Sequence, residues 1–286
     1  MIRWILLTAS LTGLAAGAAH AVTWGEPDTG EHPHVGTLLF VQNGEGFYSC
    51  TGTMISPIVM LTAGHCVAGA DENGVIQRND LTVVRFDDDA LAGINDHPNL
   101  FEWFSQDWIF AAAVEPHPMY NDYAEFPDNY DIGVVILSSP YVPTDASGNP
   151  VFGTLPDLGF LETLRGRDKQ DFTAVGYGQQ GTLPPFAQND YEKYKGSIRL
   201  LEAKSYLVNK GDSSARFSNN PGIGGGTCYG DSGGPTFYKD TEIVVAVTSF
   251  GWAKNGNCVG NDFNFRTDIM PSLNFLQDIL NAYPAD

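Results

Sequence analysis

The segment Gly226-Thr227-Cys228-Tyr229-Gly230-Asp231-Ser232-Gly233-Gly234-Pro235 carries more structural information than any other part of this sequence. Ser232 lies between an aspartate and two glycines, and Gly224 to Gly226 precede the cysteine. Glycine adopts backbone angles that hinder other residues and lets a second backbone approach closely. Ser232 can therefore present its hydroxyl outward, while the N–H groups of Gly230 and Ser232 converge. Two converging donors are what a tetrahedral oxyanion requires, so this segment is a candidate nucleophile loop.

Gly230–Pro235 resembles the nucleophile motif of the chymotrypsin-like (trypsin-like) serine proteases, the family that serves as the template for triad catalysis. Thr62-Ala63-Gly64-His65-Cys66 is similar to the family's T-A-(A/G)-H-C motif. Asp131-Ile132-Gly133-Val134-Val135-Ile136-Leu137 is similar to its D-I-A-L-L-x-L motif. The order of the histidine, the aspartate and the serine is that of this family and differs from the orders of subtilisin and the α/β-hydrolases.

The resemblance implies a catalytic triad in which Ser232 is the nucleophile, His65 the general base and Asp131 the group that orients the imidazole. It also implies an oxyanion hole formed by the N–H groups of Gly230 and Ser232. Asp128 competes with Asp131, but only Asp131 opens an apolar run, and an aspartate at the mouth of a buried strand needs a strong partner. The remaining histidines are interpreted as surface or satisfied core residues: His20, His32, His34, His97 and His117.

The composition favours a soluble protein made of many short strands. Helical apolar periodicity is scarce, while glycine and proline are plentiful. The sequence contains 34 acidic and 15 basic residues, which argues against a nucleic-acid partner or an anionic membrane partner. The family resemblance implies an all-β fold with two six-stranded Greek-key β-barrels, at about 35–145 and 150–270 within a protease domain at 22–286. A C-terminal helix is predicted at 271–283, with an apolar stripe that packs on the body.

Residues 1–21 are typical of a secretory signal peptide. Arg3 supplies a positive start, and the apolar run Trp4 to Ala18 is short for a membrane span. Ala19-His20-Ala21 is a small-x-small cleavage site. We therefore expect a secreted protein, extracellular or periplasmic. An oxidising compartment predicts that the four cysteines form two disulfides.

Cleavage after Ala21 would make Val22 the first residue of the mature chain. In the resembling family, a new N-terminal Ile or Val folds inward and its ammonium pairs with the aspartate before the nucleophile, here Asp231. Thr23 and Trp24 differ from the family's usual Ile-Val-Gly-Gly. We expect the Val22–Asp231 ion pair and an enzyme that is active once exported and folded. The resemblance also pairs the cysteines as Cys50–Cys66 and Cys228–Cys258.

In the family that this sequence resembles, the residue six positions before the nucleophile lies at the base of the pocket for the P1 residue; here that residue is Gly226. Trypsin-like members carry an aspartate there, so this chain lacks the usual charge for Arg or Lys. Ser249, Phe250 and Gly251 correspond to the family's substrate-binding strand. We predict an apolar or aromatic P1 residue. The alternative is that Asp262 reaches into the pocket and restores basic selectivity.

Two other classes remain as alternatives to a protease: a non-catalytic binding protein on the same fold and, with less support, a secreted lipase or esterase. Residues 67–126 are rich in carboxylates, and some relatives bind Ca²⁺ in this region, whereas a solvated acidic loop is the default interpretation. No other cofactor and no catalytic metal is expected. The expected partners are protein or peptide substrates and protein protease inhibitors, and we expect a monomer.

Overall fold

The computed structural model describes residues 22–125, 129–166, 168, 172–182, 190–204, 213–220, 222, 224–252 and 257–284. The expected signal peptide at 1–21 and the competing candidate Asp128 therefore lie outside the described residues. Within the described residues no helix is long and apolar enough to cross a membrane.

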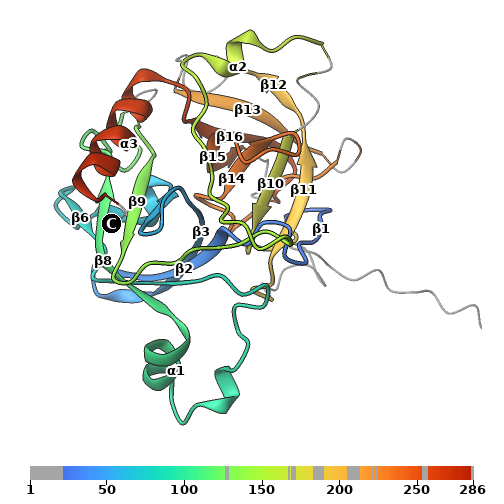
Figure 1. The fold of residues 1–286 in the computed structure, drawn as a ribbon. Helices are drawn as coiled ribbons and strands as arrows, with labels where there is room; N and C mark the ends of the chain where they lie inside the picture. Colours follow the sequence, from blue (N-terminus) through green and yellow to red (C-terminus); the bar gives the residue numbers. More distant parts are fainter. Residues whose placement is uncertain are drawn as a thin grey trace, which may run out of the picture.

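The first half of the chain closes into a six-stranded antiparallel barrel in the order β2-β3-β4-β9-β8-β7 (Figure 1). Its strands are β2 (Val35–Gln42), β3 (Glu45–Met54), β4 (Val59–Thr62), β7 (Leu81–Arg85), β8 (Ile109–Pro116) and β9 (Gly133–Leu137). The five residues of β9 are all buried. Val135 and Leu137 point into the barrel, while Val134 and Ile136 join the core between the two halves. Burial on both faces explains why the β9 sequence is continuously apolar rather than alternating.

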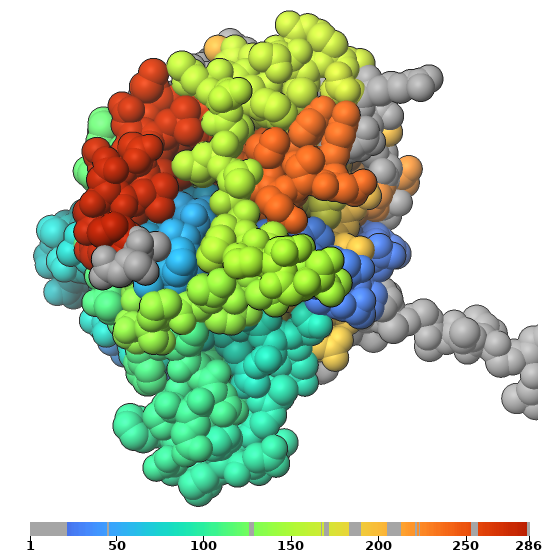
Figure 2. All heavy atoms as spheres, in the orientation of Figure 1, coloured from blue at the N-terminus to red at the C-terminus, as the bar shows by residue number. Residues whose placement is uncertain are grey.

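A long excursion between β7 and β8 departs from the loop that the sequence led us to expect. It contains the 3₁₀ helix η2 (Ile94–Asp96) and the helix α1 (Leu100–Asp107), which protrudes at the bottom of Figures 1 and 2. Asn99 caps α1 by accepting a hydrogen bond from the backbone N–H of Glu102 at 3.0 Å. Trp103 and Phe104 of α1 pack against Trp108. This aromatic cluster makes the helix possible despite its short length, because helical stability in proteins comes mainly from tertiary packing.

Some carboxylates of the acidic region at 67–126 are occupied by local contacts. Asp71 accepts hydrogen bonds from the backbone of Asn73 and Val75, and Asp87 pairs with Arg85. These contacts are those of ordinary turns and ion pairs. The sequence favours a solvated acidic loop here, and calcium binding stays the untested alternative. The neighbouring short elements are the 3₁₀ helix η1 (Gly64–Cys66) and the hairpin of β5 (Ala68–Ala70) and β6 (Ile76–Arg78).

The second half forms an eight-stranded sheet in the order β1-β11-β10-β14-β15-β16-β13-β12. Its strands are β1 (Glu26–Pro27), β10 (Phe172–Gly176), β11 (Tyr194–Ile198), β12 (Leu200–Glu202), β13 (Ser214–Asn219), β14 (Pro235–Tyr238), β15 (Val244–Trp252) and β16 (Gly260–Arg266). Only Arg199 separates β11 from β12, so these two strands are halves of one bent strand. The first half of that strand pairs with β10 and the second with β13, which brings both ends of the order together. Six strands thus make the second barrel, and β1 is an added edge strand.

The helix α3 (Met270–Ala282) covers the core between the two halves and lies beside β9 in Figure 1. A proline occupies its first turn, where the missing N–H costs no hydrogen bond. Phe275, Leu276 and Ile279 are buried against strands of both halves. The C-terminal helix and the all-β fold class predicted from the sequence are therefore confirmed. The remaining short helix is α2 (Phe160–Thr163).

A buried cation also joins the two halves. The Lys193 side chain is 1% exposed, and its ammonium lies 3.0 Å from Asp88 Oδ1. It also donates to the backbone carbonyls of His32, Val35 and Phe86, at 3.3 to 3.5 Å. Lys193 directly precedes β11 of the second half, whereas Val35 and Phe86 belong to the first barrel or its edge. These acceptors offset the cost of removing an ammonium from water.

Candidate active site

The pairing of β4 with β9 brings His65 and Asp131 together. In this antiparallel pair Thr62, the last residue of β4, is the register partner of Gly133, the first residue of β9. His65 follows Thr62 on η1, and Asp131 precedes Gly133 by two residues. Gly64 is required between them, because a Cβ there would lie 2.7 Å from the Tyr120 ring and 3.2 Å from Asp131 Oδ1. Two motifs far apart in the sequence thus meet at one end of the first barrel.

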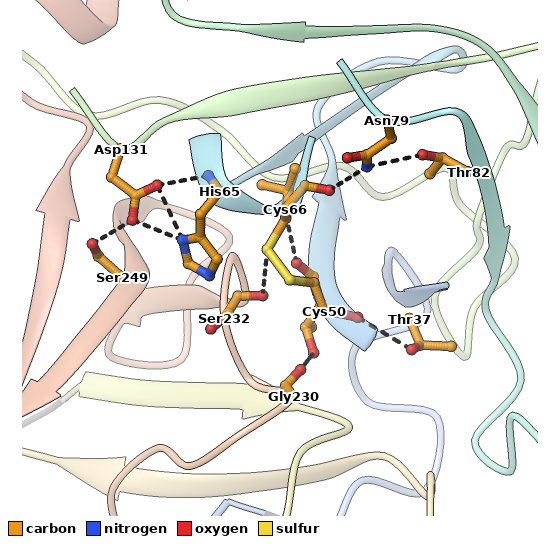
Figure 3. The surroundings of a disulfide bond; sticks show 12 residues. Thr37, Cys50, His65, Cys66, Asn79, Thr82, Asp131, Gly230, Ser232 and Ser249 are labelled. Atoms are coloured by element: carbon orange, nitrogen blue, oxygen red, sulfur yellow. Dashed lines mark hydrogen bonds and ion pairs between the residues drawn. A yellow bond between two sulfur atoms is a disulfide. The ribbon is translucent and has the colours of Figure 1, made fainter. Parts of the chain in front are cut away.

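Asp131 is fully buried and holds the imidazole by several contacts (Figure 3). His65 Nδ1 lies 3.0 Å from Asp131 Oδ2 and 3.1 Å from Oδ1. The backbone N–H of His65 donates to Oδ1 at 2.9 Å, and the Ser249 hydroxyl donates to Oδ2. A proton on Nδ1 is the tautomer that these acceptors favour, which leaves Nε2 available as a base.

Burial and charge act in opposite directions on this pair. Burial of the imidazole disfavours its protonation, but the charge of Asp131, the hydrogen bond to it and the charge of Asp122 together raise the pKa of His65. Burial would also raise the pKa of Asp131, but the charge and hydrogen bond of His65, with hydrogen bonds from Ser249 and Tyr123, hold that pKa below its ordinary value. The pair is therefore arranged so that the carboxylate stays ionised while the imidazole can accept a proton.

Ser232 reaches the same place from the second half. Its loop is tied to β3 of the first barrel, because Thr51 N–H donates to Ser232 O at 2.8 Å and Thr51 Oγ1 donates to Gly230 O at 2.9 Å. His65 and Ser232 line one cavity, and in Figure 3 the imidazole lies between the Asp131 carboxylate and Ser232. Within the described part of the chain no hydrogen bond joins their side chains. Catalytic hydrogen bonds are commonly long before substrate binds.

The backbone around Ser232 adopts a conformation that depends on glycine at two positions. Gly230 has φ of +100°, a region that glycine adopts without strain. A Cβ on Gly233 would lie 2.0 Å from Thr62 Oγ1, so only glycine permits this approach of the two halves. Among the described residues, neither the N–H of Gly230 nor that of Ser232 donates to a protein acceptor. Both donors are thus available to an oxyanion.

The structure does not bring Val22 to Asp231 as an ion pair. In the full-length chain Val22 is joined to Ala21 and carries no ammonium, and its side chain is buried in the core of the second half. The Asp231 carboxylate accepts hydrogen bonds from the N–H groups of Gly178 at 2.8 Å and Cys228 at 2.9 Å. Burial outweighs these bonds and, with the charge of Asp262, raises the pKa of Asp231 to about 7. The ion pair stays a prediction for the cleaved chain.

The cavity of about 480 Å³ runs from the His65 imidazole to Asp262. Ser249, Phe250 and Gly251 line it, as the sequence predicted. Gly226 does not line it. A Cβ on Gly226 would lie 1.9 Å from the Asn219 side chain, which fills that space and lines the cavity instead.

Asp262 is 1% exposed and lines the same cavity. It accepts hydrogen bonds from Asn219 Nδ2 at 2.9 Å and from Thr227 N–H at 2.7 Å. Burial raises its pKa to about 6, although both hydrogen bonds act to lower it. No cation of the described residues lies within ion-pair distance of Asp262, so within the described chain its charge is balanced by hydrogen bonds alone.

Disulfides brace both sides of the cavity. Cys50 is bonded to Cys66, next to His65, and Cys228 is bonded to Cys258, both of which line the cavity. Both pairings predicted from the sequence are confirmed.

Sequence reasoning missed two residues of the site. Asn219 accepts a hydrogen bond from Thr23 and donates to Thr227 O and Asp262, so it connects the N-terminal segment to the pocket. Tyr123 places its hydroxyl on Asp131. No motif marks either residue, since both act through partners that are distant in sequence or in an irregular loop.

Comparison with known proteins identifies the family of this chain. The family model described as Trypsin matches residues 23–274. Serine protease 1 and Serine protease 2 of Drosophila melanogaster are each 28% identical over 231 residues, which is 78% of this chain and 72% of each relative.

Two solved structures share the fold. One is described as HL collagenase, with a TM-score of 0.61 and 17% identity, covering 93% of this chain and 100% of the other. The second, described as the structure of GrC, has a TM-score of 0.61 and 15% identity, covering 90% and 98%. The chain belongs to the trypsin family of serine proteases and is a serine-type endopeptidase.

Proposed function

We propose that this chain is a secreted endopeptidase that cleaves peptide bonds through an acyl-enzyme on Ser232. Ser232 Oγ attacks the scissile carbonyl carbon while His65 Nε2 takes the hydroxyl proton. His65 then returns that proton to the leaving amine, and the C–N bond breaks. Water, deprotonated by the same imidazole, hydrolyses the ester and restores the serine. The observation that carries the proposal is the His65–Asp131 pair, opening on the same cavity as Ser232.

The protein around the triad supports each step. The charge of Asp131 stabilises the imidazolium that forms in both half-reactions. The N–H groups of Gly230 and Ser232 have no protein acceptor in the described chain and would receive the oxyanion. Loss of one such donor typically costs about 3–4 kcal/mol of transition-state stabilisation.

Labelling with a fluorophosphonate probe tests the nucleophile directly. We expect the wild-type protein to be labelled and to cleave a casein substrate, and Ser232→Ala to lose both activities. Ser147→Ala, in an exposed surface turn, is the matched control and should behave as wild type. Absence of labelling in a folded wild-type protein would favour the non-catalytic binding protein instead.

The residues that line the cavity change our expectation for the preferred P1 residue. Gly226 carries no charge, which favours apolar or aromatic P1 residues. Asp262, however, lines the cavity as a buried carboxylate without a cation. This observation favours the alternative, and we propose that Arg or Lys at P1 is preferred above about pH 6, where Asp262 is ionised. Cleavage of peptides that differ only at P1 (Arg, Lys, Phe, Leu) decides between the two.

Secretion and processing form the last part of the proposal. The signal-like residues 1–21 and the two disulfides support export, and cleavage after Ala21 would create the ammonium that Asp231 lacks. N-terminal sequencing of the secreted protein should begin Val22-Thr23-Trp24. Any other first residue removes this part of the proposal but leaves the triad intact.

A further inference from the structure

Tyr123 lies at the active site although no motif of the family contains it. It belongs to the loop between β8 and β9, eight residues before Asp131. Asp122 and Tyr123 both have positive φ, of 51° and 59°. This left-handed conformation is unfavourable for a bulky side chain by about 1–2 kcal/mol for each residue. Strain of this kind persists where the surroundings impose it, and it gathers at functional sites.

The Tyr123 hydroxyl contacts three groups of the site. It donates to Asp131 Oδ2 at 2.5 Å and lies 3.1 Å from His65 Nδ1 and 3.3 Å from Ser249 Oγ. Its ring is held edge-on to Phe250, with centroids 5.9 Å apart, and tilted against the His65 ring at 6.1 Å. The ring therefore occupies a defined position beside the imidazole.

The phenol remains a donor at neutral pH. Burial, the charge of Asp131 and the hydrogen bond to it raise the pKa of Tyr123 well above its ordinary value. A protonated phenol has one hydrogen, and the Asp131 carboxylate is the strongest acceptor within reach. The phenol oxygen keeps its lone pairs toward His65 Nδ1.

Asp131 Oδ2 is consequently shared. Tyr123, Ser249 and His65 Nδ1 all lie within hydrogen-bond distance of this one oxygen, which has two lone pairs. Each donor stabilises the carboxylate and withdraws part of its charge from the others. The phenol oxygen also competes with the carboxylate for the Nδ1 proton.

We propose that Tyr123 is a positioning residue of the triad, whose hydroxyl shares the Asp131 carboxylate with His65 and so sets the orientation and the basicity of the imidazole. The inference rests on the proposed function of His65 as general base. Without the hydroxyl, Asp131 would pair more strongly with the imidazolium, and His65 would hold its proton to higher pH.

Other titratable groups around His65 do not explain such an effect. Besides Asp131, the loop before β9 contributes Asp122, whose charge also raises the pKa of His65, and Tyr120, whose hydroxyl donates to Asp122 at 3.0 Å. From β15 comes Ser249, which does not titrate. Asp231 in the nucleophile loop is turned toward Gly178 and Cys228.

The test is the pH dependence of Tyr123→Phe, which removes the hydroxyl and keeps the ring. We expect the acid limb of its kcat/KM profile to move upward by about half a pH unit and kcat to fall about 2- to 10-fold. Tyr141→Phe is the matched control, because it removes a tyrosine hydroxyl that bonds the backbone carbonyl of Pro33 and neither Asp131 nor His65. Its acid limb should stay with the wild type. Superimposable profiles of Tyr123→Phe and wild type would overturn the inference.

An NMR titration of the His65 imidazole gives the same answer without relying on turnover. The pKa of His65 should be higher in Tyr123→Phe than in wild type, and Ser249→Ala, which removes another donor to the same oxygen, should shift it in the same direction. An unshifted titration in folded Tyr123→Phe sinks the positioning role. If the wild type is inactive, or if activity survives Ser232→Ala, the proposed function is wrong. The titration still shows in that case whether Tyr123 sets the pKa of His65.

Discussion

Two regions of the molecule bury aspartates, with opposite results. At the end of the first barrel, Asp131 receives the imidazole of His65, and its pKa is lowered. In the second half, no ion pair with Asp231 or Asp262 forms among the described residues, and burial raises their pKa values to about 7 and about 6. All three carboxylates are at most 1% exposed. Burial is thus common to both regions, and the difference in pKa follows from the imidazole and the two hydroxyl donors that only Asp131 receives.

The difference indicates which parts of the site are complete in the described chain. The His65–Asp131 pair is formed by residues of the first barrel alone. The two carboxylates of the second half need a cation from elsewhere. In our proposal, Asp231 obtains it from the amine of Val22 after cleavage, and Asp262 obtains it from a basic P1 side chain.

The largest effect is expected when the charge of Asp131, the aspartate paired with His65, is removed. Asp131→Asn should lower kcat/KM by about 10³- to 10⁴-fold, because the amide presents a donor to Nδ1 and selects the wrong tautomer of His65. Steady-state kinetics on one peptide substrate measures the loss. Asp145→Asn, which changes an exposed carboxylate in a surface turn, is the control and should stay within a factor of two of wild type. A loss below tenfold for Asp131→Asn would contradict the assigned role.

The unpaired carboxylates predict a pH dependence of stability in the full-length chain. The ordinary pKa of an aspartate is 3.8, and that of folded Asp231 is about 7. Between these values the folded state keeps a proton that the unfolded state has lost, so the free energy of unfolding falls as pH rises. Asp231 alone should account for about 4 kcal/mol of loss between pH 4 and pH 7. Carboxyls with lowered pKa, such as Asp131, act in the opposite direction at lower pH.

Urea unfolding at pH 4 and pH 8 measures this effect, in a Ser232→Ala background that prevents autolysis. For comparison with the full-length chain, the same measurement is made on a chain that begins at Val22. Its ammonium should pair with Asp231, lower the pKa of that carboxyl and remove most of the loss at pH 8. Identical pH dependence in the two chains would show that the amine does not reach Asp231.

A smaller effect is expected from Asp262. Asp262→Asn should reduce the kcat/KM ratio of a P1 Arg peptide over a P1 Phe peptide by about 10- to 100-fold, the size expected when a charged hydrogen-bonding partner is lost. In wild type, that ratio should rise from pH 5 to pH 7, as Asp262 loses its proton. The rate on the Phe peptide serves as the internal control. An unchanged ratio would return the preference to an apolar P1 residue.

The fold and the meeting of His65, Asp131 and Ser232 at one site were largely predictable from the sequence, because their signals are local. His65, Asp131 and Ser232 each lie in a short motif. The uninterrupted apolar run of β9 predicts that this strand is buried on both faces. The cysteine pairings also followed from the family resemblance of the segments around His65 and Ser232.

The remaining features depend on contacts between segments with no pattern of their own. α1 is stable because Trp103 and Phe104 pack against Trp108 and the edge of the barrel. The sequence of α1 shows no helical periodicity that would predict this packing. Asn219 replaces Gly226 in the pocket lining because β13 and the nucleophile loop pack closely there. Tyr123 depends on an irregular loop with two left-handed residues. These positions are set by tertiary contacts, which produce no periodic pattern in the sequence.

Lys193 has a consequence for how the chain folds. Its ammonium belongs to the second barrel in sequence, but its acceptors at Val35, Phe86 and Asp88 belong to the first barrel and its edge. Were the second barrel to form by itself, that amine would stay hydrated and this part of its surface could not close. The second barrel therefore loses part of its buried polar network without the first, and calorimetry should record one cooperative melting transition for both rather than two.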